Sequence, residues 1–194
     1  MSTVVQQSIL NKNRKDKFLL VLNLPNILKK VDKSSLGDRA SKYLNLDSLQ
    51  YSIYGSVVPS TTIPEVDMPY SGQVAKYTSY ARPQYTAVTV NFTVDNGFNN
   101  WWVLWYWLNL INNSTEGTYN YDDLPDGLSY KNMHSYETDI TVYGLDEYNN
   151  KKIQFDYLRA FITGLGEITY NYRDTEQMES TFTFAFSQLK PQLL

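Results

Sequence analysis

Hydrophobic and polar residues alternate one by one in several short segments of the chain. Between residues 86 and 96, Val88, Val90, Phe92 and Val94 alternate with threonine and asparagine. The same period of two recurs further along the chain, at residues 139–143, 167–172 and 181–186. This period places successive side chains on opposite faces, as in a strand that buries one side. These segments therefore predict half-buried strands of antiparallel sheets.

Other strands are indicated by apolar runs or by composition. Residues 18–25, FLLVLNLP, are apolar up to a proline, which is typical of a strand buried on both faces. Residues 48–58 and 151–158 also have the composition of strands, the second after a turn at 146–150. Residues 26–50 show only weak helical periodicity, and the GLG at 164–166 is interpreted as a β-turn.

The segment 98–111 has the periodicity of a helix that is apolar almost all round. One stripe of the helix consists of Phe98, Trp101, Trp102, Trp105 and Leu108. A second stripe consists of Leu104, Trp107 and Ile111. Its few polar residues are asparagines, none is charged, and Asp95 or Asn96 is suited to cap its start. Such a helix must be buried on nearly every side.

A small β domain covers only one side of this helix. The other side is covered either by a long loop of the same chain, 59–85 or 113–137, or by another subunit. In the second case Trp101, Trp102, Trp105 and Trp107 divide between the subunit core and a contact with a neighbour. A membrane-interface role is disfavoured, because no lysine or arginine flanks the tryptophans.

Three segments are expected to lie outside the regular core. Residues 1–16 form a polar N-terminal arm, and residues 113–137 form a polar loop. Residues 59–85 contain Pro59, Pro64, Pro69 and Pro83, so regular structure is disfavoured there unless the segment is an edge strand or an extended arm. A loop of this length in an oligomer is typically an arm that reaches a neighbour.

Composition narrows the class of protein. The chain has 194 residues, a size that indicates a single domain, and a net charge of −3 with no cysteine. The charge argues against a protein that grips nucleic acid, and the missing cysteine excludes disulfides and thiolate metal sites. No signal peptide is visible, and the longest apolar run, 101–108, is much shorter than the about 18 residues of a spanning helix.

Few residues are suited to catalysis. His134 is the only histidine and lies in the polar loop 113–137, so neither a histidine pair for a metal nor a histidine-based triad is expected. The paired carboxylates fall in turns and loops, where acidic residues are common, and no glycine motif for phosphate is present. We expect no enzyme activity, no cofactor and no metal.

The outward faces of the expected strands carry threonine, asparagine, serine and alanine with little charge. Such a face stays hydrated yet offers no cations to hold passing phosphates, as the wall of a DNA conduit requires. The alternative is that these residues are simply acceptable on any β surface.

The order of elements along most of the chain, with its firm motifs in 86–187, resembles that of the tail tube proteins of contractile-tailed bacteriophages. The similarity lies in the N-terminal strand KDKFLLVLNLP, the turn and helix NFTVDNGFNNWWVLWYWLNLIN and the closing strand FTFAF. In the helix segment the matching residues are Asp95, Phe98, Trp102 and Trp107. In the turn AFITGLGEITY they are Phe161, Leu165, Gly166 and Ile168. No single motif is specific, and the order carries the resemblance.

The resemblance implies a mainly β fold, a small β-barrel or two packed antiparallel sheets with one flanking helix and long extended loops, as one domain over 1–194. It implies a structural virion protein, assembled in the host cytoplasm, whose hexameric rings stack into the tail tube for genome delivery. The partners it implies are further copies of the chain, the tail sheath protein, and the baseplate and tail-terminator proteins. The tape measure protein and DNA would pass through the lumen without sequence-specific binding.

Candidate residues follow for each role in such a tube. Those expected to line the lumen are Thr89, Asn91, Thr93, Thr169, Asn171, Thr181 and Thr183. Those expected in the helix that divides between core and neighbour are Phe98, Trp101, Trp102, Trp105 and Trp107. Those expected in the inter-subunit loop 59–85 are Pro59, Pro64, Pro69, Tyr70, Tyr77 and Tyr80.

Two alternatives stay open at this point. One is a tube initiator, baseplate or tail-terminator ring of the same fold, because the insert at 26–50 and the tryptophan-rich helix depart from the family pattern. The other is a carbohydrate-binding β-sandwich, in which the tyrosines at 119, 121, 130 and 136 would stack on sugars.

Overall fold

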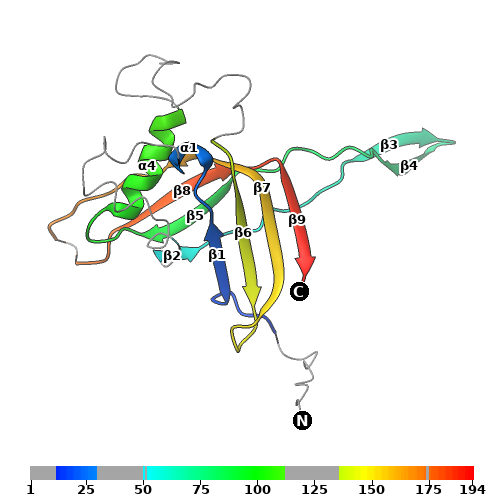
Figure 1. Ribbon diagram of the computed structural model, residues 1–194. Helices are drawn as coiled ribbons and strands as arrows, with labels where there is room; N and C mark the ends of the chain where they lie inside the picture. The colour runs from blue at the N-terminus through cyan, green and yellow to red at the C-terminus, as the bar shows by residue number, and fades with distance from the viewer. Residues whose placement is uncertain (1–11, 30–49, 51, 112–135, 174) are drawn as a thin grey trace, which may run out of the picture.

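The computed structural model of the chain describes residues 12–29, 50, 52–111, 136–173 and 175–194 (Figure 1). The elements in chain order are β1 (Phe18–Leu22), α1 (Asn26–Lys29), β2 (Ile53–Gly55), β3 (Glu65–Tyr70), β4 (Gln73–Thr78), β5 (Val88–Thr93), α4 (Asn99–Ile111), β6 (Thr138–Leu145), β7 (Lys151–Leu165), β8 (Glu179–Ala185) and β9 (Gln188–Leu193).

All described strands pair antiparallel, in two separate sheets. The larger is a seven-stranded sheet of order β1-β6-β7-β8-β5-β2, in which β9 also pairs with β7. The smaller is the two-stranded pair β3-β4. The large sheet curls into a nearly closed barrel, with α4 on its flank (Figure 1). The predicted fold class, mainly β with antiparallel sheets and one flanking helix, is confirmed.

The long strand β7 closes this barrel by changing partners at a bulge. It pairs with β6 as far as Ala160 and with β9 as far as Leu158, and from Phe161 it pairs with β8. Between these parts Arg159 has a φ of 55°, and its N–H donates to the Asp139 carboxylate at 3.1 Å. A bulge of this kind bends a strand and increases its twist. One continuous strand therefore belongs to both walls of the barrel.

The core is built from the alternating positions that the sequence indicated. In β5 and β8, Val90 is the partner of Phe182 and Val88 is the partner of Phe184, and all four side chains are buried. Ile140 and Val142 of β6 are buried too. The predicted inward faces of these strands are confirmed. β1 differs from its prediction: only Leu20 and Leu22 are buried, because β1 lies at the edge of the sheet and its other face stays half-buried.

Two elements near the C-terminus differ from their predictions. The expected strand at 167–172 and the expected turn at 164–166 are wrong, because β7 runs on to Leu165 and pairs with Phe182. Gly166 then donates its N–H to the Thr181 carbonyl, and a Cβ at this position would clash with the Thr181 side chain. The chain leaves the sheet here, so Tyr170 and Tyr172 are exposed.

Strand β9 was not predicted. Its sequence, QLKPQL, has weak alternation and a proline that normally argues against a strand. Pro191 is tolerated because β9 pairs only with β7, so its other edge needs no N–H donor at this position. Two further expectations lie partly outside the described residues: within 26–50 only α1 and Gln50 are described, and the strand expected at 48–58 is seen as β2.

The start of α4 is held by the predicted cap residue Asp95. Its carboxylate accepts the Asn99 N–H at 2.7 Å, whereas Asn96 is exposed. Asn100 is fully buried and joins the helix to the preceding strand, because its side-chain amide donates to the Thr93 carbonyl at 2.9 Å. The bond to Asp95 satisfies one of the N–H groups that a helix start leaves without an intrahelical partner. Together the two bonds fix the angle at which α4 leaves β5.

Tyr157 gives the barrel a pH dependence that can be tested. Its ring is buried against Phe184 and Phe186, and burial raises the pKa of its hydroxyl to about 12. Below pH about 10 the hydroxyl is protonated in both the folded and unfolded states, so this group adds no pH dependence there. Between pH about 10 and about 12 only the unfolded chain ionises it, so the free energy of unfolding falls as pH rises.

We therefore expect the free energy of unfolding of Tyr157→Phe, relative to that of the natural chain, to be about 1.4 kcal/mol higher at pH 11 than at pH 9. At pH 9 the substitution should cost less than about 1 kcal/mol, because the hydroxyl makes only a 3.4 Å hydrogen bond, to the Val57 carbonyl. Denaturant unfolding of both proteins at the two pH values measures this change. The other tyrosines are present in both proteins, so their contributions cancel in the comparison. Parallel loss of stability in both proteins would contradict the assigned pKa.

Candidate assembly surfaces

The outward face of β5 and β8 is a small, nearly neutral surface. Thr89 is the cross-strand partner of Thr183 and their hydroxyls lie 3.3 Å apart, while Asn91 is the partner of Thr181. Five of the predicted lumen residues, Thr89, Asn91, Thr93, Thr181 and Thr183, therefore lie side by side on one face of the sheet.

The charge on this face is confined to one end. Thr93 is opposite Glu179, whose carboxylate accepts the Tyr54 hydroxyl at 2.7 Å. That bond raises the pKa of the Tyr54 hydroxyl. The outward positions of β5 and β8 hold no lysine or arginine. This described surface therefore has nothing that would bind a phosphate by charge.

The other two lumen candidates lie elsewhere. Thr169 and Asn171 belong to the segment that follows β7, outside any strand, and both are exposed. The expectation that they share a strand face rested on the wrong strand at 167–172. Their part in a lumen stays a prediction.

The segment 59–85 contains a β-hairpin that projects away from the barrel (Figure 1). Strands β3 and β4 are joined by Ser71 and Gly72, whose φ angles of 50° and 80° are those of a two-residue type I′ turn. Pro69 fits because each strand of an isolated hairpin has a free edge. The prediction disfavoured regular structure here except as an edge strand or extended arm, and the hairpin is that exception.

The two faces of the hairpin differ sharply in polarity. On one face Val66 is opposite Tyr77 and Met68 is opposite Ala75, and Tyr70 lies at the same face near the turn. The exposed fractions of Val66, Met68 and Tyr77 are 45%, 52% and 57%. An isolated hairpin is at best marginally stable in water. Burying this apolar face would stabilise it.

The opposite face of the hairpin is polar except near the turn, where Pro69 is opposite the exposed Val74. Glu65 is opposite Thr78 and Asp67 is opposite Lys76, and Lys76 forms an ion pair with Glu65. Because this pair is exposed, it contributes little to stability. The hairpin is thus amphipathic, with one face suited to protein contact and the other to solvent.

The residues predicted for the inter-subunit loop differ in their exposure to solvent. Pro59 is buried, whereas the others, Pro64, Pro69, Tyr70, Tyr77 and Tyr80, are exposed. Val66 and Met68 were missed as candidates. The signal for them was present in the sequence, as alternation on both sides of a two-residue Ser-Gly turn.

Helix α4 separates its tryptophans by burial. Trp107 is fully buried, and its indole N–H donates to the Tyr136 carbonyl at 3.1 Å. Trp101, Trp102 and Trp105 are half-buried, and Trp102 stacks on Tyr106 with ring centroids 4.9 Å apart. The stripe that contains Leu104 and Trp107 therefore faces the core. In the larger stripe Trp101 and Trp102 pack against the edge of this core, and Trp105 does not.

The alternative that residues 59–85 cover the outer side of α4 is wrong, because the hairpin points away from the helix (Figure 1). The other covering loop, 113–137, lies outside the described residues apart from 136 and 137. His134 lies outside the described residues as well.

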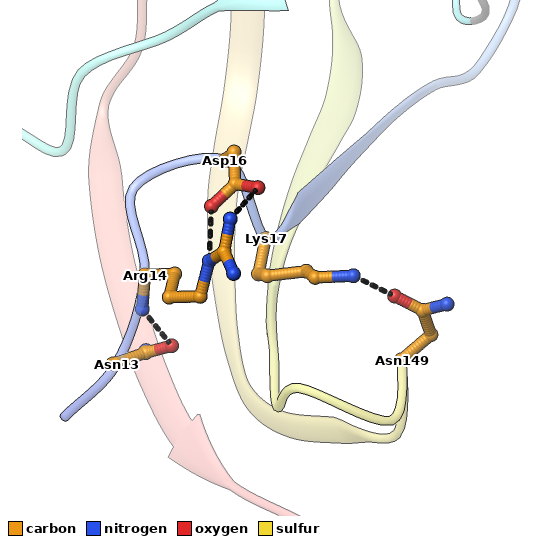
Figure 2. A network of polar contacts seen from close by, with 5 residues as sticks. All are labelled: Asn13, Arg14, Asp16, Lys17 and Asn149. Carbon is orange, nitrogen blue, oxygen red and sulfur yellow. Dashed lines mark hydrogen bonds and ion pairs between the residues drawn. The ribbon is translucent and has the colours of Figure 1, made fainter. Parts of the chain in front are cut away.

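The N-terminal segment enters β1 through a polar network (Figure 2). The Arg14 guanidinium donates two hydrogen bonds to Asp16, at 3.0 and 2.9 Å, and this contact lowers the pKa of the carboxyl. Lys17 donates to the side chain of Asn149 at 2.9 Å, which ties the segment to the turn between β6 and β7. Residues 12–16 are exposed, as expected for the end of a polar arm.

That turn is itself held by one carboxylate. Asp146 accepts hydrogen bonds from the side chain of Asn150 and from the backbone N–H groups of Asn150 and Tyr148. These bonds, the Asn150 side chain foremost, lower the pKa of Asp146. A turn-forming role accounts for this carboxylate.

The described residues contain no cluster of three or more histidine, cysteine, aspartate or glutamate side chains that could hold a metal ion. Within the same residues, no helix has the length and apolarity needed to cross a membrane.

Several solved structures share this fold. The sheath–tube complex of the PVC extracellular contractile injection system includes a chain of the same fold, with a TM-score of 0.60 at 11% identity over 100% of both chains. The tube-terminating cap of the anti-feeding prophage matches with a TM-score of 0.59 at 13% identity, again over 100% of both chains. The fold is thus that of proteins in contractile injection systems.

The sequence itself identifies the family. The sequence profile of phage tail tube proteins matches residues 13–191, nearly the whole chain. The chain therefore belongs to the phage tail tube protein family, and it is a structural protein of a phage-type tail. No curated protein matches the chain in sequence.

Proposed function

We propose that this chain is the repeating subunit of a tail tube, which assembles as hexameric rings stacked around a channel for DNA. The observation that carries the proposal is the neutral outward face of β5 and β8, which we assign to the channel wall. The family match to the tube protein favours this subunit over an initiator or terminator ring. It also favours a tube over a carbohydrate-binding sandwich, for which the buried Trp107 would be a poor platform.

The wall assignment rests on charge and side-chain size. DNA is held electrostatically by lysine and arginine, which release counterions from the phosphates. Short hydroxyl and amide side chains keep the wall hydrated without holding the strand. Of the predicted lumen residues, Thr89, Asn91, Thr181 and Thr183 form two adjacent cross-strand pairs on this face. The tape measure protein and DNA would pass along it without sequence-specific contacts.

Other parts of the molecule are assigned to assembly. The hairpin in residues 59–85 is the arm that joins rings or adjacent protomers, because its apolar face is exposed. The half-buried tryptophans of α4, Trp101, Trp102 and Trp105, contact a neighbouring subunit, while Trp107 serves the core. Residues 1–16 act as a polar arm, and the whole chain, 1–194, is one domain.

The external partners follow from the tail architecture. One structure of the same fold is a sheath–tube complex in the extended state, and another includes a sheath/tube terminator with a TM-score of 0.51. We therefore assign the tail sheath protein, the tail-terminator protein and the baseplate as partners of the assembled tube. The role is mechanical, with no enzyme activity.

The wall assignment predicts the effect of adding positive charge. Tubes made from the triple variant Thr89→Lys, Thr181→Lys and Thr183→Lys should assemble normally but deliver their genome at least about tenfold less well, because repeated lysines hold phosphates. The measurement is infectivity of particles whose tails are intact by electron microscopy.

The matched control places glutamine at the same three positions, since it is of similar bulk and carries no charge. Glutamine should leave delivery near the natural level. Equal delivery by the lysine and natural tubes would remove these residues from the channel wall.

A further inference from the structure

A groove with a volume of about 810 Å³ opens where two extended segments separate. Strands β5 and β8 are paired as far as Val88 and Phe184, and just outside this pair the rings of Tyr85 and Phe186 pack with centroids 5.0 Å apart. Further from the β5–β8 pair, the segment at Arg82 and strand β9 separate, because β9 pairs with β7. The groove lies between these two segments.

The floor of the groove is apolar and one of its sides is a strand edge. Phe161, Phe186 and Leu189 contribute apolar lining. Strand β9 pairs with β7 along one edge only, and no described strand pairs with its other edge. A free edge presents unpaired N–H and C=O groups to any extended segment that enters beside it, and on β9 only Pro191, which follows the groove residue Lys190, lacks the N–H. The groove is thus shaped for a β-strand.

Two cations line the groove. Arg82 and Lys190 are both exposed, and neither forms an ion pair with a described residue. The nearest cross-strand carboxylate, Asp156 opposite Lys190, already accepts hydrogen bonds from Thr141 and Gln154. A segment that fits the groove should therefore carry carboxylates as well as apolar side chains.

The hairpin of this chain has that pattern on β3. Glu65 and Asp67 alternate there with Val66 and Met68, and β3 has a free edge opposite to β4. Lys76 pairs with Glu65, and Asp67 has no ion pair with a described residue. In its own chain the hairpin projects away from the barrel (Figure 1), so its own groove is not its binding site.

We propose that the groove between Arg82–Tyr85 and Phe186–Lys190 receives strand β3 of the hairpin from a second copy of the chain. This inference rests on the proposed tube assembly and names the surface that accepts the arm. One copy supplies the hairpin and the next supplies the groove, so the contact is head-to-tail and repeats along a ring or between rings. The Val66 and Met68 side chains cover the apolar floor, and Asp67 lies near the two cations.

Disulfide cross-linking tests the contact in assembled protein. The natural chain has no cysteine, so each introduced thiol is unique. Single-cysteine proteins Val66→Cys, Met68→Cys and Tyr70→Cys are each mixed with Leu189→Cys, assembled and oxidised. Because a disulfide needs Cβ atoms within about 4.5 Å, at least one pair should give a covalent heterodimer. Tyr172→Cys, exposed and remote from the groove, replaces Leu189→Cys as the control and should give none.

Charge reversal provides an independent readout. Asp67→Lys and Arg82→Glu should each raise the protein concentration needed for assembly at least about tenfold. The double variant should assemble at a concentration much closer to that of the natural chain. Arg173→Glu, also exposed, is the matched control. If tubes form but no cysteine pair cross-links and the double variant assembles no better than the single variants, the proposed contact between β3 and the groove is wrong, while the proposed tube function stands. Absence of rings and tubes from the natural chain would overturn both.

Discussion

Replacing residues 63–80 with a short glycine-serine linker is expected to leave the barrel folded and to abolish tube assembly. The linker can close the gap because the two arms of the segment lie together, with the Ser79 N–H donating to the Pro64 carbonyl at 3.0 Å. The removed hairpin carries the exposed side chains of Val66, Met68 and Tyr77. Burying each contributes about 1.5–3 kcal/mol, so losing all three removes at least about 4 kcal/mol per contact, roughly a thousandfold in affinity.

Circular dichroism and thermal unfolding report the barrel, and electron microscopy reports assembly. A finer variant keeps the hairpin and changes only its apolar face, as Val66→Thr, Met68→Gln and Tyr77→Thr, and should also fail to assemble. The control changes the polar face, as Thr78→Ser and Lys76→Gln, and should assemble. Tubes of normal length from the hairpin-less protein would refute the role of the hairpin.

Trp107→Ala is expected to destabilise the subunit by about 3–5 kcal/mol, the usual cost of removing a large buried aromatic side chain. The indole is fully buried, and its loss would also leave the Tyr136 carbonyl without this donor. Val103 and Leu104 of the same helix are buried in the same core. Because they are held by the helix, they cannot move far into the cavity that the indole would leave.

Trp105→Ala is the matched control, because Trp105 lies on the same helix, is half-buried and does not pack on the buried core. It should cost the monomer less than about 1 kcal/mol yet weaken assembly. Denaturant unfolding measures the first effect and sedimentation measures the second. Equal destabilisation by the two substitutions would contradict the division of the tryptophans between core and neighbour.

Local patterns in the sequence predicted the core strands correctly. In β5 and β8 the period of two identified the inward valine and phenylalanine side chains, since a half-buried strand requires that alternation, but it missed the buried Ser180. The capping role of Asp95 was also predictable, because a short acidic side chain before a helix accepts its free N–H groups. The two apolar stripes of the helix were also predicted, but the stripes alone did not say which of them faces the core, so the burial of Trp107 was not predicted.

The missed features depend on pairing between distant segments. The GLG at 164–166 has the composition of a turn, yet β7 includes Gly164 and Leu165 because Thr183 and Phe182 of β8 are available as partners. Strand β9 tolerates Pro191 because no described strand pairs with its outer edge. The tyrosines 170 and 172 alternate as in a strand, but the chain leaves the sheet after Gly166, whose N–H makes a hydrogen bond to the Thr181 carbonyl. Such pairings are set by the tertiary fold and not by local propensity.

Negative-stain electron microscopy of the purified chain across a concentration series tests tube formation most directly. We expect rings or hollow tubes of uniform diameter with a central channel, growing in number and length with concentration. Particles that stay monomeric at high concentration, from protein shown to be folded by circular dichroism, would contradict self-assembly as the function of this chain.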